Sequence, residues 1–318
     1  MKSTVLSLLA AAMLASAAGP ASAGSVQKTF PSFLPENTLQ IPVGFSAAGL
    51  KENEFNQVLD RVQAVYGPIV AAKGGQLVIE RNWDDPTVNA YATEDGKQWN
   101  ISMFGGLARY PSITRDAFYL VACHELGHHL GGSPKISGTD WATNEVGADY
   151  YSTLKCLRRV LPATAPDGVD PVAAKACDAS FRDRASRNRC KASAMAGFAA
   201  ATLFQQLSQT GPISFATPDP SVVAAMDDSH PAAQCRLDTY FQGALCAKPV
   251  DQDVSNTDPN AGACTRKQRF AVGLRPRCWY KPPADEPAAL ELASHFSKKD
   301  VEGIQARLES LRAAFGGK

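Results

Sequence analysis

The sequence predicts an α+β fold in which a small, mostly antiparallel sheet packs on a mainly helical body. Two observations support this prediction. Several long segments carry apolar residues at helical spacing, whereas three short segments between residues 76 and 104 have the residue types and turn signals of strands. The chain has 318 residues, of which 45% are hydrophobic, so it can bury one large core or two small ones.

The first residues are typical of a secretory signal peptide. Lys2 is followed by an apolar run over residues 5–18, and small residues at 21–23 suit a cleavage site. The apolar run is too short to span a bilayer as a helix, which disfavours the alternative of a membrane anchor. We therefore expect residues 1–23 to be removed on export to the periplasm or the medium, and residues 24–48 to form a Pro-rich arm on the body.

The first regular elements are expected between residues 52 and 104. Apolar residues at helical spacing predict a helix over residues 52–72. Three strands follow over residues 76–80, 88–93 and 98–104, and the last two flank the turn at Glu94-Asp95-Gly96. These strands make up the predicted sheet.

A second helix is predicted between Thr114, a plausible N-cap, and Gly131. It contains the motif His124-Glu125-x-x-His128, whose histidines lie on one helix face, one turn apart. At that spacing both imidazoles can bind one zinc ion, with Glu125 beside them as a base. Taken alone, the motif also fits an ordinary amphipathic helix with two partly exposed histidines.

A third zinc ligand is expected on the next helix, predicted over residues 143–160. Catalytic zinc takes three protein ligands and leaves its fourth position to water. The intervening loop lets the two helices pack as a hairpin, so that Glu145 can reach the metal. Asp149, one turn further on, can then accept the second ring N–H of His124. The alternative for both carboxylates is a favourable interaction with the helix dipole alone.

The remaining helices and the domain limits follow from periodicity and composition. An Ala-rich helix is predicted over residues 190–209, and another runs to residue 246 from Ser229-His230-Pro231, with Pro231 in its first turn. We expect a body over residues 49–246. Residues 247–318 then form a disulfide-tied extension that ends in an amphipathic helix.

Eight cysteines in an exported chain predict disulfides, and the absence of any Cys-x-x-Cys pair disfavours a cysteine zinc site. Cys235 and Cys246 are expected in one helix about 16 Å apart, beyond the reach of a disulfide. Two pairs are plausible as local loops, while the rest of the pairing stays open: Cys177–Cys190 and Cys264–Cys278.

The order of these motifs resembles a known family. His124-Glu125-x-x-His128 followed by Asn144-Glu145-x-x-Ala148-Asp149 looks like the gluzincin metallopeptidases, and within them the HtpX and CAAX-prenyl-protease-type family. Three further stretches, in the family's order, are similar to its Asn-Ala-Phe strand, its Gly-Leu-Leu segment and its Thr-His-Pro-x-x-x-x-Arg-Ile motif: Val88-Asn89-Ala90-Tyr91-Ala92, Phe104-Gly105-Gly106-Leu107, and Ser229-His230-Pro231 with Arg236-Leu237. The match covers about residues 50–240.

The resemblance implies a zincin-like fold with the active-site helix beneath the sheet, and an endopeptidase that hydrolyses extended polypeptides. In such an enzyme Glu125 activates a zinc-bound water. By analogy His230 and Arg236 are the candidate donors to the developing oxyanion. The ligands of Zn²⁺ and the strand beside which the substrate would lie are implied in the same way: His124, His128 and Glu145 for the ion, and Asn89, Ala90 and Tyr91 for the substrate.

Departures from the family leave other interpretations open. The family is often membrane-embedded, whereas no segment after the signal peptide is apolar enough to span a membrane, so the family's substrates cannot be carried over. The net charge of +1 falls to zero once Lys2 leaves with the predicted signal peptide, and a neutral chain argues against a general binder of nucleic acid or membrane surfaces. The alternative function is a non-catalytic metal-binding protein of peptidase fold that acts as a chaperone-like or interaction module. A structural protein with a coincidental motif is favoured least, and the oligomeric state stays open.

Overall fold

The computed structural model describes residues 31–45 and 48–286. The predicted signal peptide, residues 1–23, and the predicted terminal amphipathic helix, within residues 287–318, lie outside the described residues.

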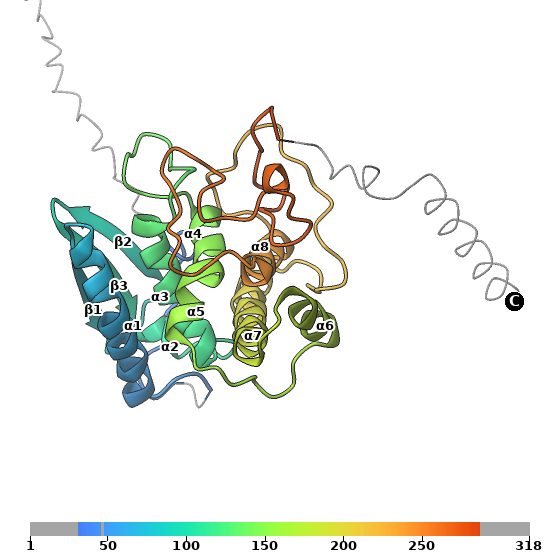
Figure 1. The fold of residues 1–318 in the computed structure, drawn as a ribbon. Coiled ribbons are helices and arrows are strands. Elements are labelled where there is room, and N and C mark those ends of the chain that lie inside the picture. The colour runs from blue at the N-terminus through green and yellow to red at the C-terminus, as the bar shows by residue number, and fades with distance from the viewer. Residues whose placement is uncertain (1–30, 46–47, 287–318) are drawn as a thin grey trace, which may run out of the picture.

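Three strands form one mixed sheet in the order β1-β3-β2 (Figure 1). β1 (Gln76–Asn82) pairs in parallel with β3 (Gln98–Phe104), and β2 (Ala90–Asp95) pairs antiparallel with the other edge of β3. The prediction of a mostly antiparallel sheet is therefore wrong for one of the two pairings. β2 and β3 form the expected antiparallel hairpin. The other edge of β3 pairs with β1, and these two strands run in the same direction.

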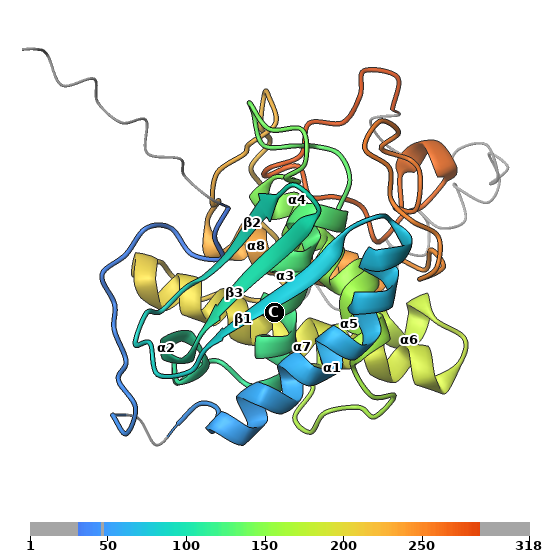
Figure 2. The ribbon, with the colours of Figure 1, turned by 90° about the vertical axis from the view of Figure 1, so that its left-hand side faces the viewer.

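One face of the sheet is buried against two helices, as Figure 2 shows with the sheet in front. α1 (Glu52–Ala72) lies along β1, and α3 (Arg115–Leu130) lies against β2 and β3. Alternate residues of the strands point into this layer and are buried: Leu77, Ala90, Ala92, Ile101 and Met103. The helix that carries the histidine motif thus lies beneath the sheet, as the sequence predicted.

The helix predicted over residues 143–160 is a helical run with one π turn in its middle. α4 (Glu145–Tyr151) leads into the π turn (Ser152–Cys156), which continues as α5 (Leu157–Val160). A π turn inserts one residue into the helix and often lies near a functional site. Here it follows directly after the helix that carries Glu145 and Asp149.

The rest of the helical body departs from the predictions at helix starts. α7 (Arg184–Ser208) begins six residues earlier than expected, because the Asp183 side chain accepts from Ser186 N and caps it there. α8 (Ala233–Leu245) begins later, so Pro231 lies outside it and not in its first turn. Two helices were not predicted: α2 (Gly105–Ala108) and α6 (Pro171–Ser180).

All eight cysteines form disulfides: Cys123–Cys156, Cys177–Cys190, Cys235–Cys278 and Cys246–Cys264. The predicted Cys177–Cys190 pair is confirmed, and Cys264–Cys278 is wrong. Cys235 and Cys246, at the two ends of α8, are bonded to Cys278 and Cys264. The residues that follow α8 are therefore held at both ends of this helix. Four disulfides indicate a protein that folds in an oxidising compartment.

We call residues 247–286 the C-terminal extension. It is irregular apart from a short 3₁₀ turn (Arg266–Gln268), yet it contributes Trp279, fully buried, to a second core against α4 and α8. None of the helices in the described residues has the length and apolarity needed to cross a bilayer.

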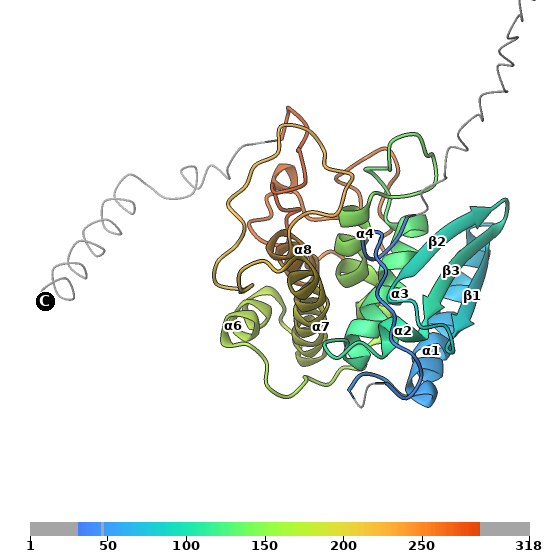
Figure 3. The same cartoon turned by 180° about the vertical axis from the view of Figure 1, so that it is seen from behind.

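We call residues 31–45 the N-terminal segment. It runs between β2 and the helical body, where Figure 3 shows it in blue. Antiparallel bridges join Ser32 to Tyr91 and Gln40 to Thr87, so the chain itself covers the start of the outer edge of β2 and the residue Thr87 that precedes it.

Candidate metal centre

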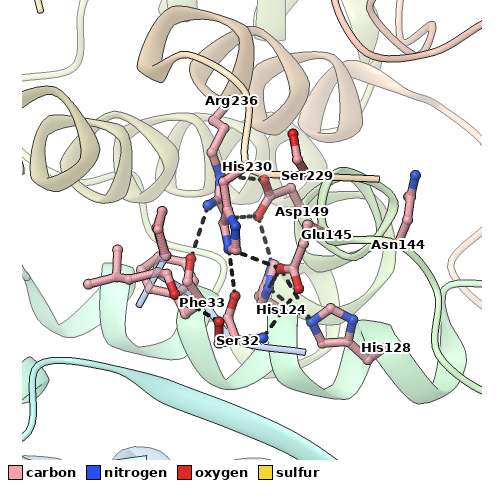
Figure 4. A network of polar contacts seen from close by, with 12 residues as sticks. Ser32, Phe33, His124, His128, Asn144, Glu145, Asp149, Ser229, His230 and Arg236 are labelled. Carbon is pink, nitrogen blue, oxygen red and sulfur yellow. Dashed lines mark hydrogen bonds and ion pairs between the residues drawn. The ribbon is translucent and has the colours of Figure 1, made fainter. Parts of the chain in front are cut away.

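His124 and His128 point their rings at one another from successive turns of α3 (Figure 4). Both are fully buried, and their Nε2 atoms lie 3.2 Å apart. His124 Nδ1 lies 2.7 Å from Asp149 Oδ1, and His128 Nδ1 lies 2.7 Å from the carbonyl oxygen of Thr143. Both contacts suit Nδ1–H as the donor, and in the neutral imidazole this leaves Nε2 with a lone pair that faces the other ring.

Glu145 adds a carboxylate oxygen to this pair. The Asn144 side chain accepts from Gly147 N and starts α4 at Glu145, whose Oε2 lies 3.2 Å from His124 Nε2 and 3.7 Å from His128 Nε2. Tetrahedral zinc with bonds of about 2.0–2.1 Å separates its ligand atoms by about 3.3–3.4 Å. Glu145 Oε2 has no hydrogen-bond partner among the described residues, so the three atoms fit the ligand set of a divalent ion.

Close packing of α3 on α4 makes this approach possible. A Cβ at Gly127 would lie 2.9 Å from Ala148 Cα, a distance that real Cβ atoms essentially never show. The glycine in the motif therefore lets the two helix backbones come together. The Cys123–Cys156 disulfide joins the same α3 to the π turn after α4.

Glu125 lies beside the imidazoles but further away than Glu145. Its Oε2 is 4.0 Å from His128 Nε2, and neither of its oxygens has a hydrogen-bond partner within the described residues. Burial raises the pKa of this carboxyl to about 8. A buried carboxyl without a hydrogen-bond partner, next to three convergent ligand atoms, is placed to exchange a proton with a water molecule there.

A buried network holds His124 from behind. Asp149 Oδ1 accepts from His124 Nδ1, from Arg236 Nη2 at 2.6 Å and from Tyr240 OH at 2.7 Å, and its Oδ2 accepts from Arg236 Nε at 2.7 Å. Burial disfavours the charged carboxylate, but the Arg236 guanidinium and His124 outweigh it and hold the pKa of Asp149 well below its usual range. A charged Asp149 keeps the proton of His124 on Nδ1 and so aims Nε2 at the ligand position.

The protein atoms alone set opposite charges at the centre. Burial lowers the pKa of His128 to about 4. Burial also disfavours charge on His124 and Glu145, but Asp149 and Glu145 raise the pKa of His124 to about 9, and the two histidines lower that of Glu145 to about 2. Near pH 7 these protein atoms alone present a negative Glu145, a neutral His128 and a protonated His124, which loses its Nε2 proton when a metal binds there. Imidazole and carboxylate donors suit zinc and related divalent ions.

The two predicted oxyanion donors have different surroundings. His230 Nε2 lies 3.4 Å from Glu145 Oε2 and 2.8 Å from the carbonyl oxygen of Ser32, so it faces the centre. Arg236 is fully buried, forms a bidentate pair with Asp149 and donates to the carbonyl oxygen of Phe33. Its contacts are those of a residue that positions His124 through Asp149.

The predicted substrate strand lies at the start of β2, and its edge is already paired. Phe33 N donates to Ala90 O at 3.1 Å, and the Asn89 side chain accepts from Leu34 N at 2.9 Å and donates to Leu34 O at 3.1 Å. The Tyr91 backbone faces Ser32 across an antiparallel bridge. The three residues named from the sequence therefore bind an extended segment, which belongs to the same chain.

Several residues of the centre were not identified from the sequence. Tyr240 follows Arg236 by four residues on α8, a spacing that could have suggested a shared partner. Thr143 and Ser32 act through backbone atoms, for which the residue type gives no signal.

Comparison of the chain with models of protein families, with curated proteins and with solved structures gives no match.

Proposed function

We propose that this protein is a zinc-dependent endopeptidase. The observation that carries the proposal is the triangle of His124 Nε2, His128 Nε2 and Glu145 Oε2, with edges of 3.2, 3.2 and 3.7 Å. Its edges approximate those of tetrahedral zinc, and the buried carboxylate of Glu125 lies next to it. Two imidazoles, one carboxylate and an adjacent base form the donor set of a hydrolytic zinc site.

When bound, zinc would polarise the scissile carbonyl and lower the pKa of a water molecule. Glu125 takes a proton from the attacking water as the new C–O bond forms, and it delivers that proton to the leaving amine when the amide C–N bond then breaks. His230 donates to the oxygen that becomes negative. Arg236 and Tyr240 hold Asp149, which in turn orients His124.

The proposed substrate is an extended polypeptide that pairs with the edge of β2 at Asn89, Ala90 and Tyr91. Main-chain pairing of this kind accepts many sequences. The predicted signal peptide and the four disulfides support a periplasmic or secreted location.

The test compares the purified exported chain with Glu125→Gln. We expect about one zinc per chain in both proteins by elemental analysis, and cleavage of a quenched peptide library that falls by about 10²–10⁴-fold in Glu125→Gln. Glu52→Gln, at an exposed position on α1, is the matched control and should cleave like the wild type. A chain that binds no divalent metal contradicts the proposal. Both proteins are assayed intact and after the specific cut in the N-terminal segment described below.

A second candidate function is that of a metal-binding interaction protein without turnover. It is favoured by one observation, namely that the edge of β2 beside the centre is covered by residues of the same chain. Zinc in both proteins, with no cleavage by either the intact or the cut wild type, would support this second candidate over the first.

A further inference from the structure

We propose that residues 31–34 occupy the substrate groove of the intact chain as a tethered competitor, and that a polypeptide binds only when they leave. This inference rests on the proposed function and adds the regulation of the same site. It also names a substrate class, which is extended peptides with two adjacent bulky apolar residues.

The backbone of the N-terminal segment pairs with an edge of the sheet. β2 is an edge strand, and the N-terminal segment adds to it as an antiparallel neighbour through Phe33 N to Ala90 O and Ala92 N to Pro31 O, both 3.1 Å. Such strand addition is the usual way for a sheet edge to bind an extended peptide. The segment therefore fills the main-chain bonding positions that a substrate would need.

The paired segment also contacts the candidate metal centre through the backbone of Ser32. Ser32 N donates to Glu145 Oε1 at 3.2 Å, while His230 Nε2 donates to Ser32 O at 2.8 Å (Figure 4). The carbonyl of the Ser32–Phe33 peptide thus accepts a hydrogen bond from His230, the side chain proposed to stabilise the oxyanion. A substrate carbonyl could not reach His230 while the Ser32 carbonyl is bonded there.

Two buried side chains hold the N-terminal segment against the body. Phe33 and Leu34 are fully buried. The Phe33 ring packs edge-on against His124 and Phe204, with centroids 5.3 and 5.2 Å away. The Arg236 guanidinium also lies 5.3 Å from the Phe33 ring, so the ring sits among aromatic and cationic groups next to a proposed metal ligand. Such a site selects the peptide that lies in the groove, and Phe33 shows the kind of side chain that fits it.

The N-terminal segment is attached to the body without a covalent cross-link. No cysteine precedes Cys123, so no disulfide ties the N-terminal segment to the body. Beyond Leu34 the segment is exposed at residues 35–40. A tethered occupant competes at an effective concentration in the millimolar range, but once it is cut it competes only at its actual concentration.

The experiment cuts the segment after the protein has folded, because deleting the buried Phe33 before folding could prevent folding. A recognition sequence for a site-specific protease is inserted between Glu36 and Asn37, both exposed. The control carries the same insertion between Asp167 and Gly168, an exposed loop. After cutting and gel filtration, we expect peptide hydrolysis to rise at least about tenfold only in the first protein.

A binding measurement separates this inference from the proposed function. A fluorescent peptide of residues 29–36 is titrated into the Glu125→Gln protein, intact and cut, and followed by fluorescence polarisation. We expect binding to the cut protein alone, weakened at least about tenfold when the peptide carries Phe33→Ala. Binding without any hydrolysis would support the inference and contradict the endopeptidase.

Three outcomes would overturn the inference. The first is equal peptide binding by the intact and cut proteins. The second is a cut fragment that stays through gel filtration and does not exchange with the labelled peptide, which would make residues 31–34 a permanent part of the fold. The third is hydrolysis that rises equally in the control cut after Asp167.

Discussion

The N-terminal segment and the C-terminal extension are both irregular, yet they are attached by different physics. The extension is held by two disulfides to the ends of α8 and buries Trp279 in its own core. The segment has no covalent tie beyond its continuity with the chain, and it is held by strand pairing, by the Asn89 side chain and by two buried apolar side chains. The covering of α8 is therefore fixed covalently, whereas no covalent bond would have to break for the segment over the candidate metal centre to open.

The largest expected effect is the loss of the disulfide that spans the extension. The Cys235–Cys278 pair closes a loop of 43 residues, so we expect Cys235→Ala with Cys278→Ala to reduce the free energy of unfolding by about 4 kcal/mol, measured by urea titration. Limited proteolysis should then cut within residues 247–286.

The matched control for that variant is Cys177→Ala with Cys190→Ala, a separation of 13 residues between α6 and α7. It should lose about 3 kcal/mol and leave the extension resistant to protease. If both double variants left the extension equally resistant, the extension would not depend on its covalent tie and the comparison would fail.

A smaller effect is expected for Asn89→Ala, which removes the side chain that bonds both backbone groups of Leu34. Leaving these buried groups unpaired costs about 1–3 kcal/mol, so hydrogen exchange at the Phe33 and Ala92 amides should speed up about 5- to 150-fold. Amides of α3 should be unchanged. Asn53→Ala, at an exposed position on α1, is the control and should change neither set. Faster exchange throughout α3 would show that the segment opens only with the whole body.

The smallest effect is expected where the extension meets α1 through an exposed ion pair. Lys73 Nζ lies 2.6 Å from Asp253 Oδ2, and both side chains are open to solvent. Lys73→Ala should change the free energy of unfolding by no more than about 1 kcal/mol, and the difference should shrink in 1 M salt. A loss of more than about 2 kcal/mol would mean that charge, and not the disulfides, holds the extension.

Local signals in the sequence predicted local structure well. α1 and β3 have the expected bounds, and Thr114 caps α3 through its bond from Ala117 N. These elements have strong periodicity and clear end signals. The late start of α8 was missed because Pro231 suits a first helical turn but equally suits the loop that carries His230 to the metal centre.

Partners distant in sequence were predicted only where a motif linked them. The spacing of His124 and His128 directed attention to one helix face, and the short loop to Glu145 made its approach foreseeable. Nothing in the residue types reveals that Ser32 lies opposite Tyr91, or that β3 docks on β1, because backbone pairing is nearly independent of sequence. The disulfide partners of Cys264 and Cys278 were missed because the positions of cysteines in the sequence do not determine which of them meet in the fold.

The bond between Cys123 and Cys156 lies one residue from His124 and bridges the two helices whose side chains converge on the ion. This disulfide holds the two helical segments of the candidate metal centre together, and in the reduced chain His124, His128 and Glu145 would lack this covalent link. The bond forms only where thiols can be oxidised. If the chain is exported as proposed, the candidate site would be completed only after export.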